Sequence, residues 1–418
     1  MNVWQFLKRR IHCYGEQIAF SKDKTTYSDL IALVENKKDG QRKIPIIAKG
    51  ETRQEQAIKI LQIMAGGNIP VPVEKSYGVD REEKIEKILE NNCDDLSKTA
   101  AILFTSGTTG EPKGVKLSHK GIIQNLKGIE KYFQVQTGQK ILIARPLVHI
   151  AVFTGELLFA LYKGLEIDFY EETFQPARLA NYIDENKVRL FGCTPTLLYH
   201  LSKYLRGDSL DSIVISGERL TEGVAEILKE KFPYKRFYNV YGLTENSPRV
   251  AALCPEEFFE KIGSVGKPIA HTKVKLAQGE LLVKSRSLMQ GYLGDREKTD
   301  EKLKNGWLHT GDMARMDKDG YLTVLGRKDD MMIRSGMNIY PAEIENIAMQ
   351  IVGVRDCAVY GEDDIHYGQK ICMKVVADMG IAALRKELIV RLPAYLVPDK
   401  ILIVESLEMT PSGKVKRK

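Results

Sequence analysis

Residues 105–114 read TSGTTGEPKG, a stretch in which four hydroxyl side chains and two glycines precede Lys113 and a third glycine follows it. Glycine lets main-chain N–H groups approach a ligand closely, hydroxyls donate hydrogen bonds, and lysine adds a compact positive charge. The stretch therefore predicts a phosphate-binding loop. The alternative interpretation is a surface turn that binds no ligand. The candidate phosphate-binding residues are Thr105, Ser106, Gly107, Thr108, Thr109, Gly110 and Lys113.

This loop differs from the P-loop of nucleotide triphosphatases. The spacing is Gly107-x-x-Gly110-x-x-Lys113, whereas a P-loop reads GxxxxGK followed by Ser or Thr. Pro112 also lacks the N–H that a P-loop needs beside its lysine. The sequence predicts a phosphate loop of another kind.

The segments around the loop predict a layered α/β fold. Residues 99–104, TAAILF, read as a buried strand that leads into the loop, and Ser118 is a candidate N-cap of the helix that follows. Apolar runs that alternate with helical segments predict a parallel α/β layer. From about residue 262 short strands with Gly turns predict an antiparallel sheet, and a small α+β unit follows GRKDD at 326–330. We expect a large N-terminal domain at 1–328, with α/β subdomains and a β-rich subdomain, and a small C-terminal domain at 329–418.

Composition indicates an ordinary globular protein. Of the 418 residues 43% are hydrophobic and 28% charged, and the net charge of +7 is spread along the chain. That balance suits an anionic small molecule or an acidic protein partner and does not require nucleic acid. The basic residues at 414–418 read, taken alone, as a solvated tail.

Other features predict a cytoplasmic location. The six cysteines show no CxxC pair, which is typical of reduced thiols. The first residues lack the apolar stretch of a signal peptide. The longest apolar segment, 147–162, is interrupted by Glu156 and is shorter than the roughly 20 residues that a membrane span needs. We expect a cytoplasmic protein without a membrane span.

Seven motifs in order resemble the ANL adenylating superfamily, which includes acyl- and aryl-CoA synthetases, adenylation domains of peptide synthetases and luciferases. A chance match to one motif is plausible, whereas a match to all of them in order is not. Residues 1–104 precede the phosphate loop, which is a shorter N-terminal region than family members usually carry. The motifs are TSGTTGEPKGV (105–115), PLVHI (146–150), SGERL (216–220), YNVYGLTE (238–245), WLHTGD (307–312), GRKDDMMIRSGMNIYPAEIE (326–345) and PSGKVKR (411–417).

The resemblance implies a nucleotide and metal site at YGLTE and SGERL. Tyr241 would pack against adenine, Thr244 would reach a phosphate, and Glu245 would help to hold Mg²⁺, which favours a few carboxylate oxygens and substrate phosphates. Gly217 and Glu218 would lie beside the adenine. Without this context, Glu245 would be read as a solvated loop acid.

The resemblance also assigns the ribose and catalytic residues. Asp312 and Arg327 match the positions that grip the ribose hydroxyls, and a carboxylate makes strong charge-assisted bonds there. The alternative for Arg327 is a salt bridge with Asp329 or Asp330. Lys414 matches the catalytic lysine, and with Lys113, Thr244 and Glu245 it forms the implied catalytic set.

The resemblance further implies domain rotation and an acyl gate. Asp329 would be the hinge about which the C-terminal domain turns between half-reactions, after which the loop around Gly336 would open a channel for a thiol. Met337 stands where many relatives carry a second glycine. His149 matches the gate of the acyl pocket, although a histidine beside apolar residues is often only a packing residue.

The sequence is compatible with three functions. The first is an ATP- and Mg²⁺-dependent acid–thiol ligase that forms an acyl-AMP and transfers the acyl group to CoA. The second is a stand-alone enzyme that loads the phosphopantetheine of a carrier protein, and the third is a degenerate nucleotide-binding scaffold. HIAVFTGELL (149–158) offers no Asp for an α-ammonium group, so we expect an aryl or fatty acid without an α-amino group.

Overall fold

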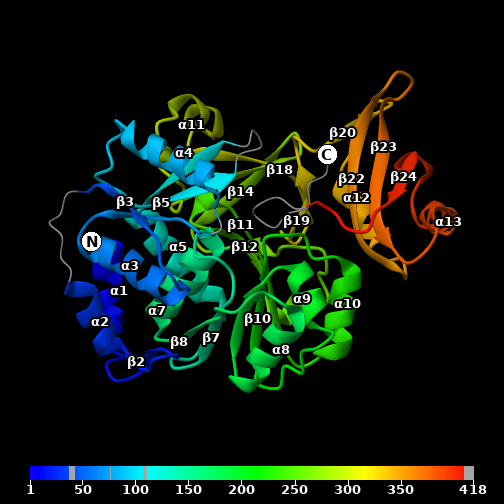
Figure 1. The fold of residues 1–418 in the computed structure, drawn as a ribbon. Helices are drawn as coiled ribbons and strands as arrows, with labels where there is room; N and C mark the ends of the chain where they lie inside the picture. The colour runs from blue at the N-terminus through cyan, green and yellow to red at the C-terminus, as the bar shows by residue number, and fades with distance from the viewer. Residues whose placement is uncertain (37–42, 76, 107–110, 409–418) are drawn as a thin grey trace.

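The computed structural model describes residues 1–36, 43–75, 77–106 and 111–408 (Figure 1). Their largest sheet has nine strands, in which the central strands are parallel and β2, β12 and β13 are antiparallel to their neighbours. The predicted parallel layer is therefore present, with antiparallel edges. In spatial order the strands are β13 (Lys267–Pro268), β12 (Arg249–Leu253), β11 (Arg236–Gly242), β10 (Ser212–Ser216), β9 (Leu190–Cys193), β7 (Lys140–Ile143), β8 (Glu166–Phe169), β1 (Ile18–Phe20) and β2 (Thr25–Thr26).

Two hydrophobic cores cover the two faces of this sheet. Successive strand residues point to opposite faces, and in β7 Ile141 and Ile143 join one core whereas Leu142 joins the other. The sheet is thus buried on both sides, as the apolar runs of its strands require. The first core includes α5 (His119–Tyr132), α6 (Ile150–Val152), the π-helical segment Phe153–Leu158 and α7 (Phe159–Lys163), and the second includes α8 (Pro176–Glu185), α9 (Pro195–Leu201) and α10 (Glu222–Lys231).

The strand that leads into the phosphate loop lies outside the large sheet. β5 (Thr99–Ser106) and β6 (Pro112–Ser118) form an antiparallel pair, and β16 (Gly291–Tyr292) pairs with β6. The strands on either side of residues 107–110 are therefore paired with each other, which the expected strand–helix alternation did not predict. The Ser118 side chain accepts a hydrogen bond from the Gly121 N–H at 2.9 Å, which confirms Ser118 as the N-cap of α5.

The β-rich region predicted from about residue 262 is an antiparallel sheet. It contains the order β14-β15-β18-β17, with β19 paired to the other part of β18. This sheet carries Asp312 on β18 and Arg327 at the end of β19. The elements are β14 (Thr272–Ala277), β15 (Glu280–Ser285), α11 (Arg296–Lys302), β17 (Leu303–Lys304), β18 (Trp307–Met316) and β19 (Leu322–Arg327).

The C-terminal region forms a lobe of its own, seen at the right of Figure 1. Its buried residues make a separate hydrophobic core that runs from Met332 to Ile401. The predicted small α+β unit is present, while the boundary at 328/329 stays a prediction. The elements are β20 (Met332–Arg334), β21 (Met337–Ile339), α12 (Pro341–Ala348), β22 (Val354–Asp364), β23 (Gly368–Ala377), α13 (Ile381–Arg391) and β24 (Lys400–Ile403).

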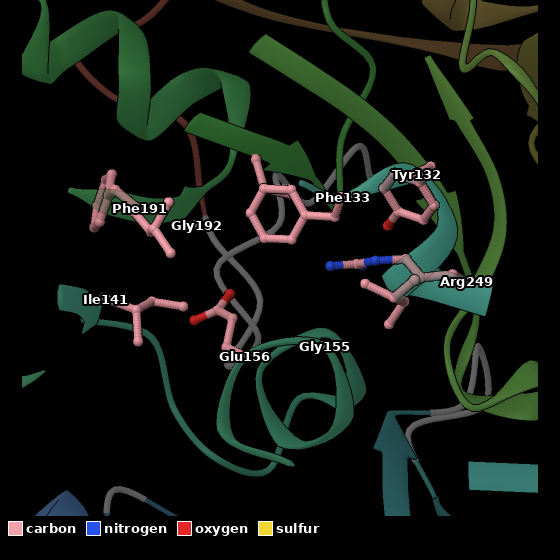
Figure 2. A pocket seen from close by; sticks show the side chains of 11 residues that line it. Tyr132, Phe133, Ile141, Gly155, Glu156, Phe191, Gly192 and Arg249 are labelled. Atoms are coloured by element: carbon pink, nitrogen blue, oxygen red, sulfur yellow. The ribbon is translucent and has the colours of Figure 1, made fainter. Parts of the chain in front are cut away.

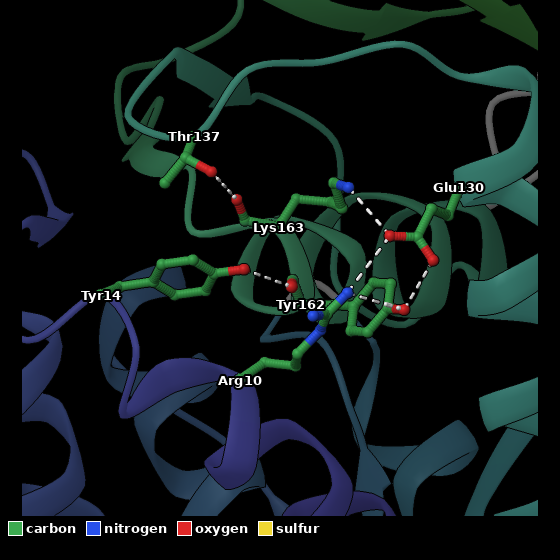
Figure 3. Close-up of polar contacts among 6 residues, drawn as sticks. All are labelled: Arg10, Tyr14, Glu130, Thr137, Tyr162 and Lys163. Carbon is green, nitrogen blue, oxygen red and sulfur yellow. Dashed lines mark hydrogen bonds and ion pairs between the residues drawn. The ribbon is translucent and has the colours of Figure 1, made fainter.

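The N-terminal helix packs on the helices of the first core. Figure 3 shows Arg10 and Tyr14, from α1 and the turn after it, beside Glu130 of α5 and Tyr162 of α7. The Tyr162 hydroxyl donates to Glu130 at 2.7 Å, and the Tyr14 hydroxyl donates to the Tyr162 carbonyl at 3.0 Å. Lys163 and Arg10 also contact Glu130. The N-terminal elements are α1 (Val3–Ile11), α2 (Tyr27–Glu35), β3 (Pro45–Ala48), α3 (Arg53–Ala65), β4 (Ile69–Pro72) and α4 (Val79–Glu90).

Tyr27 offers a test of how this N-terminal region is anchored. Its side chain is fully buried, and its hydroxyl donates to the Leu165 carbonyl at 2.6 Å. Tyr27→Phe leaves that buried carbonyl without this donor, so we expect the free energy of unfolding to fall by about 1–2 kcal/mol. Urea denaturation measures the change, and Tyr234→Phe is the matched control because Tyr234 is 94% exposed. Equal stability of the two variants would contradict this account.

No helix in the described ranges is long and apolar enough to cross a membrane.

Candidate active site

Asp312, Arg327 and Tyr241 form one polar cluster. Asp312 and Arg327 are register partners on β18 and β19, and Arg327 Nη1 donates to Asp312 Oδ1 at 3.0 Å. The Tyr241 hydroxyl, from β11, donates to Asp312 Oδ2. The structure thus brings together three residues that are 71 and 15 positions apart in the sequence, and the salt-bridge partner of Arg327 seen here is Asp312.

Asp312 accepts hydrogen bonds in this cluster, and Tyr241 and Arg327 donate them. Asp312 is only 7% exposed. Burial and the nearby Asp312 carboxylate raise the pKa of Tyr241 well above its ordinary value, so this phenol stays neutral and donates. Burial lowers the pKa of Arg327, but Asp312, Glu245 and Tyr241 together raise it above its ordinary value, so the guanidinium keeps its charge. A ligand hydroxyl that reaches Asp312 therefore meets a carboxyl group whose two oxygens are held in place by Arg327 and Tyr241.

Glu245 is tied to the strand that follows the phosphate loop. It lies in a short 3-10 turn, Thr244–Asn246, directly after β11. The Tyr292 hydroxyl donates to Glu245 Oε1 at 2.8 Å, and Tyr292 is the register partner of Val115 on β6. Sequence reasoning missed Tyr292, because only the tertiary contact of β16 with β6 gives it this role.

Lys113 lies on β6 opposite Thr105 of β5. It lines a cavity of about 370 Å³ together with Tyr292 and Asp295. Lys113 and Glu245 are therefore both linked to Tyr292, one through a shared cavity and one through a hydrogen bond. Four predicted loop residues, Gly107, Thr108, Thr109 and Gly110, lie outside the described residues, as does Lys414.

Gly217 and Glu218 follow β10 directly. Gly217 has φ +93°, a backbone conformation that favours glycine, and the Thr196 hydroxyl donates to Glu218 Oε2 at 2.7 Å. Glu218 thus links the end of β10 to α9, which follows β9. The loops after the neighbouring strands β9, β10 and β11 lie at one edge of the sheet, where ligands bind in open α/β folds.

The remaining predicted residues lie at exposed positions. His149 is the N-cap residue of α6 and is exposed. Asp329 is exposed in the turn between β19 and β20. Ser335 and Gly336, with φ +50° and +79°, form the tight turn of the hairpin β20–β21, and Met337 beside them is 40% exposed. The gate and hinge roles stay predictions.

Sequence reasoning missed a buried cluster of charged side chains beneath the sheet edge. Figure 2 shows Glu156 and Arg249 pointing toward one space, with Phe133, Ile141 and Phe191 around it. Glu156 is 3% exposed and forms an ion pair with Arg145. Burial raises the pKa of Glu156, while Arg145 opposes the shift. A glutamate within the apolar segment 147–162 was the signal in the sequence that pointed to this cluster.

Two protein-family models match the sequence of this chain. The model of the AMP-binding enzyme family matches residues 17–293, and that of the AMP-binding enzyme C-terminal domain matches residues 343–414. The chain belongs to the AMP-binding enzyme family. This confirms the ANL resemblance and the expected fold, a large N-terminal domain followed by a small C-terminal one.

Relatives of this AMP-binding protein include named ligases. A 2-succinylbenzoate–CoA ligase of Listeria monocytogenes is 32% identical over 330 residues, which cover 77% of this chain and 70% of the relative. A feruloyl-CoA synthase of Amycolatopsis is 32% identical over 381 residues, which cover 86% of this chain and 76% of the relative.

Solved structures share the fold over the whole chain. The o-succinylbenzoate CoA synthetase of Bacillus subtilis, in complex with its acyl-adenylate intermediate, has a TM-score of 0.86 at 23% identity and covers 100% of this chain and 97% of its own. ATP-bound MatB of Rhodopseudomonas palustris has a TM-score of 0.88 at 21% identity, with 99% and 97% covered.

Proposed function

We propose that this AMP-binding protein is an acid–thiol ligase that uses ATP and Mg²⁺ to activate a carboxylic acid as acyl-AMP and transfers the acyl group to CoA. The Asp312–Arg327–Tyr241 cluster is the observation that carries the proposal, because it presents an oriented carboxylate between the strand of YGLTE and the strand of TGD. Relatives named as CoA ligases support the reaction class.

The residues divide the work of adenylation. Asp312 accepts hydrogen bonds from the ribose hydroxyls, with Arg327 and Tyr241 fixing its two oxygens. Lys113 faces the phosphates, and Lys414 neutralises charge as the acid oxygen attacks the α-phosphate and pyrophosphate leaves. This chemistry depends on positioning and electrostatics and needs no covalent enzyme intermediate.

The residues present fit a magnesium ion that is shared with the nucleotide. Such an ion is held by one or two carboxylates together with substrate phosphates. Glu245 supplies one carboxylate, fixed by the Tyr292 hydroxyl next to the strand of Lys113. When bound, the ion would offset the negative charge that develops on the leaving pyrophosphate.

We further propose that CoA is the thiol that accepts the acyl group. The absence of an Asp in residues 149–158 disfavours an amino acid substrate, and with it the amino-acid-loading enzymes. The relatives named as CoA ligases favour CoA over the phosphopantetheine of a carrier protein. A degenerate scaffold has no physical need for Lys113, Glu245, Asp312, Arg327 and Lys414 together.

A pyrophosphate-release screen tests the activation step. Purified protein, ATP and Mg²⁺ are incubated with a panel of aryl, medium-chain and α-amino acids, each with and without CoA. We expect acid-dependent pyrophosphate release with at least one acid that lacks an α-amino group. Release with amino acids alone, or with no acid at all, would overturn the proposal.

Tyr292 gives a test of the metal assignment. Tyr292→Phe removes the hydrogen bond to Glu245 Oε1 but keeps the ring, so we expect the Mg²⁺ concentration for half-maximal adenylation to rise about 3- to 10-fold, the size of one lost hydrogen bond to a charged group. The rate at saturating Mg²⁺ should change less. Tyr321→Phe is the control, since Tyr321 is buried in the second core. A lower saturated rate with an unchanged Mg²⁺ requirement would reject a positioning role.

A further inference from the structure

The cluster of Arg145, Glu156 and Arg249 is built into the fold. Gly192 leaves room for Glu156, because a Cβ there would lie 2.4 Å from Glu156 Oε1. Gly155 leaves room for Arg249, because a Cβ there would lie 2.8 Å from Arg249 Nη2. Contacts this close would force the charged side chains to move. Each of these two buried side chains is therefore matched by a glycine on another element.

Polar atoms of this cluster lack partners among the described residues. Arg145 uses Nη2 for Glu156 and Nη1 for the Ser216 hydroxyl, at 3.2 Å. Glu156 Oε2 and Arg249 Nε are buried, and within the described part of the chain neither has a hydrogen-bond partner. Leaving a buried charged group unpaired is costly. One acceptor and one donor are thus available at the same cavity.

The cavity between them is small. Its volume is about 10 Å³, which is room for about one water-sized group. Glu156 and Arg249 both line it, with Phe133 and Phe191 among the apolar residues around them. A hydroxyl group fits this space and can donate and accept at once. A carboxylate is larger and would face the Glu156 carboxylate.

The cavity adjoins the segments that carry the candidate nucleotide site. Arg249 is the register partner of Gly242, which follows Tyr241. Ser216, which Arg145 contacts, precedes Gly217, and Glu156 lies seven positions after His149 in the helical segment that follows it. The cavity and the candidate nucleotide site are therefore built from neighbouring residues of the same segments.

We infer that Glu156 and Arg249 select an acid with a hydroxyl group at its distal end, which donates to Glu156 Oε2 and accepts from the Arg249 guanidinium. This inference rests on the proposed ligase function and names its substrate class, a hydroxylated aryl or short aliphatic acid.

Matched substrate pairs test the inference. Hydroxybenzoates, hydroxycinnamates and terminally hydroxylated butanoate and hexanoate are each compared with the unsubstituted acid and with its methyl ether. We expect at least one hydroxylated acid to exceed both partners at least about 10-fold in kcat/KM for adenylation, since a site built to bind a hydroxyl rejects analogues without it. Equal or better use of the unsubstituted acid throughout the panel would overturn the inference.

Two variants test whether the preference for hydroxylated acids depends on Glu156. Glu156→Gln replaces the acceptor by an amide, and Gly192→Ala displaces the carboxylate through its new Cβ. We expect both to reduce the hydroxyl preference, a ratio measured within each variant, at least about 5-fold. Gly380→Ala is the matched control, because a Cβ there meets nothing within 4 Å. An unchanged ratio in folded Glu156→Gln and Gly192→Ala, verified by thermal unfolding, would place the selectivity elsewhere.

A binding measurement separates this inference from the ligase proposal. The same acid pairs are titrated calorimetrically into the protein with AMP present. A hydroxyl preference in binding without any turnover would support the cavity and reject the ligase. Turnover without a preference in either assay would support the ligase and reject the cavity.

Discussion

Asp312→Ala is expected to lower kcat/KM for ATP about 100-fold or more. The change removes a buried carboxylate that two side chains orient, and it leaves the Arg327 guanidinium without its partner. Charge-assisted hydrogen bonds to ligand hydroxyls are among the stronger polar contacts, and two are lost together. Initial rates of pyrophosphate release over a range of ATP concentrations measure the effect.

Asp319→Ala is the control for this experiment. Asp319 lies in the exposed turn between β18 and β19 and pairs with Lys261 at 3.1 Å, so its loss removes a carboxylate near the same two strands but outside the cluster. Exposed ion pairs contribute little to stability. A similar loss in both variants would show that the β18–β19 pair, and not the Asp312 carboxylate, is what the reaction needs.

Lys414→Ala is expected to slow acyl-AMP formation about 100-fold or more, the scale expected when a charge partner of a transition state is removed. The expectation rests on PSGKVKR at 411–417 and its resemblance to the family motif. We expect the variant still to convert supplied acyl-AMP to thioester, because we assign the lysine to adenylation alone. Single-turnover assays of the two half-reactions separate the effects.

Lys416→Ala is the matched control for Lys414. If the end of the chain is only a basic tail, the two lysines are equivalent and both variants lose the same small amount of activity. An equal loss of both half-reactions in Lys414→Ala alone would instead reject the assignment to adenylation.

Much of the site was predictable because its residues belong to short motifs. Asp312 stands in the motif WLHTGD within β18 and Arg327 in the motif GRKDD at the end of β19, and the antiparallel pairing of these two strands brings the residues into register. The Ser118 N-cap was predictable for the same reason, since capping depends on residues three positions apart.

The parts that were missed depend on contacts between distant segments. The hairpin β5–β6 was hidden because TAAILF is as apolar as a strand of the parallel sheet, and only its partner distinguishes the two. Glu156 and Arg249 come from different elements and meet only after β12 pairs with β11. Neither local residue spacing nor hydrophobic periodicity predicts that Glu156 and Arg249 lie close together.

The products of a complete reaction test the proposed function. The protein is incubated with ATP, Mg²⁺, CoA and each acid of the matched panel, and the nucleotide and thioester products are identified by mass spectrometry. The account predicts AMP, pyrophosphate and acyl-CoA in equal amounts over multiple turnovers, with a hydroxylated acid as the best substrate. Formation of ADP and phosphate, or of an acyl-AMP that CoA never discharges but a phosphopantetheinylated carrier protein does, would contradict it.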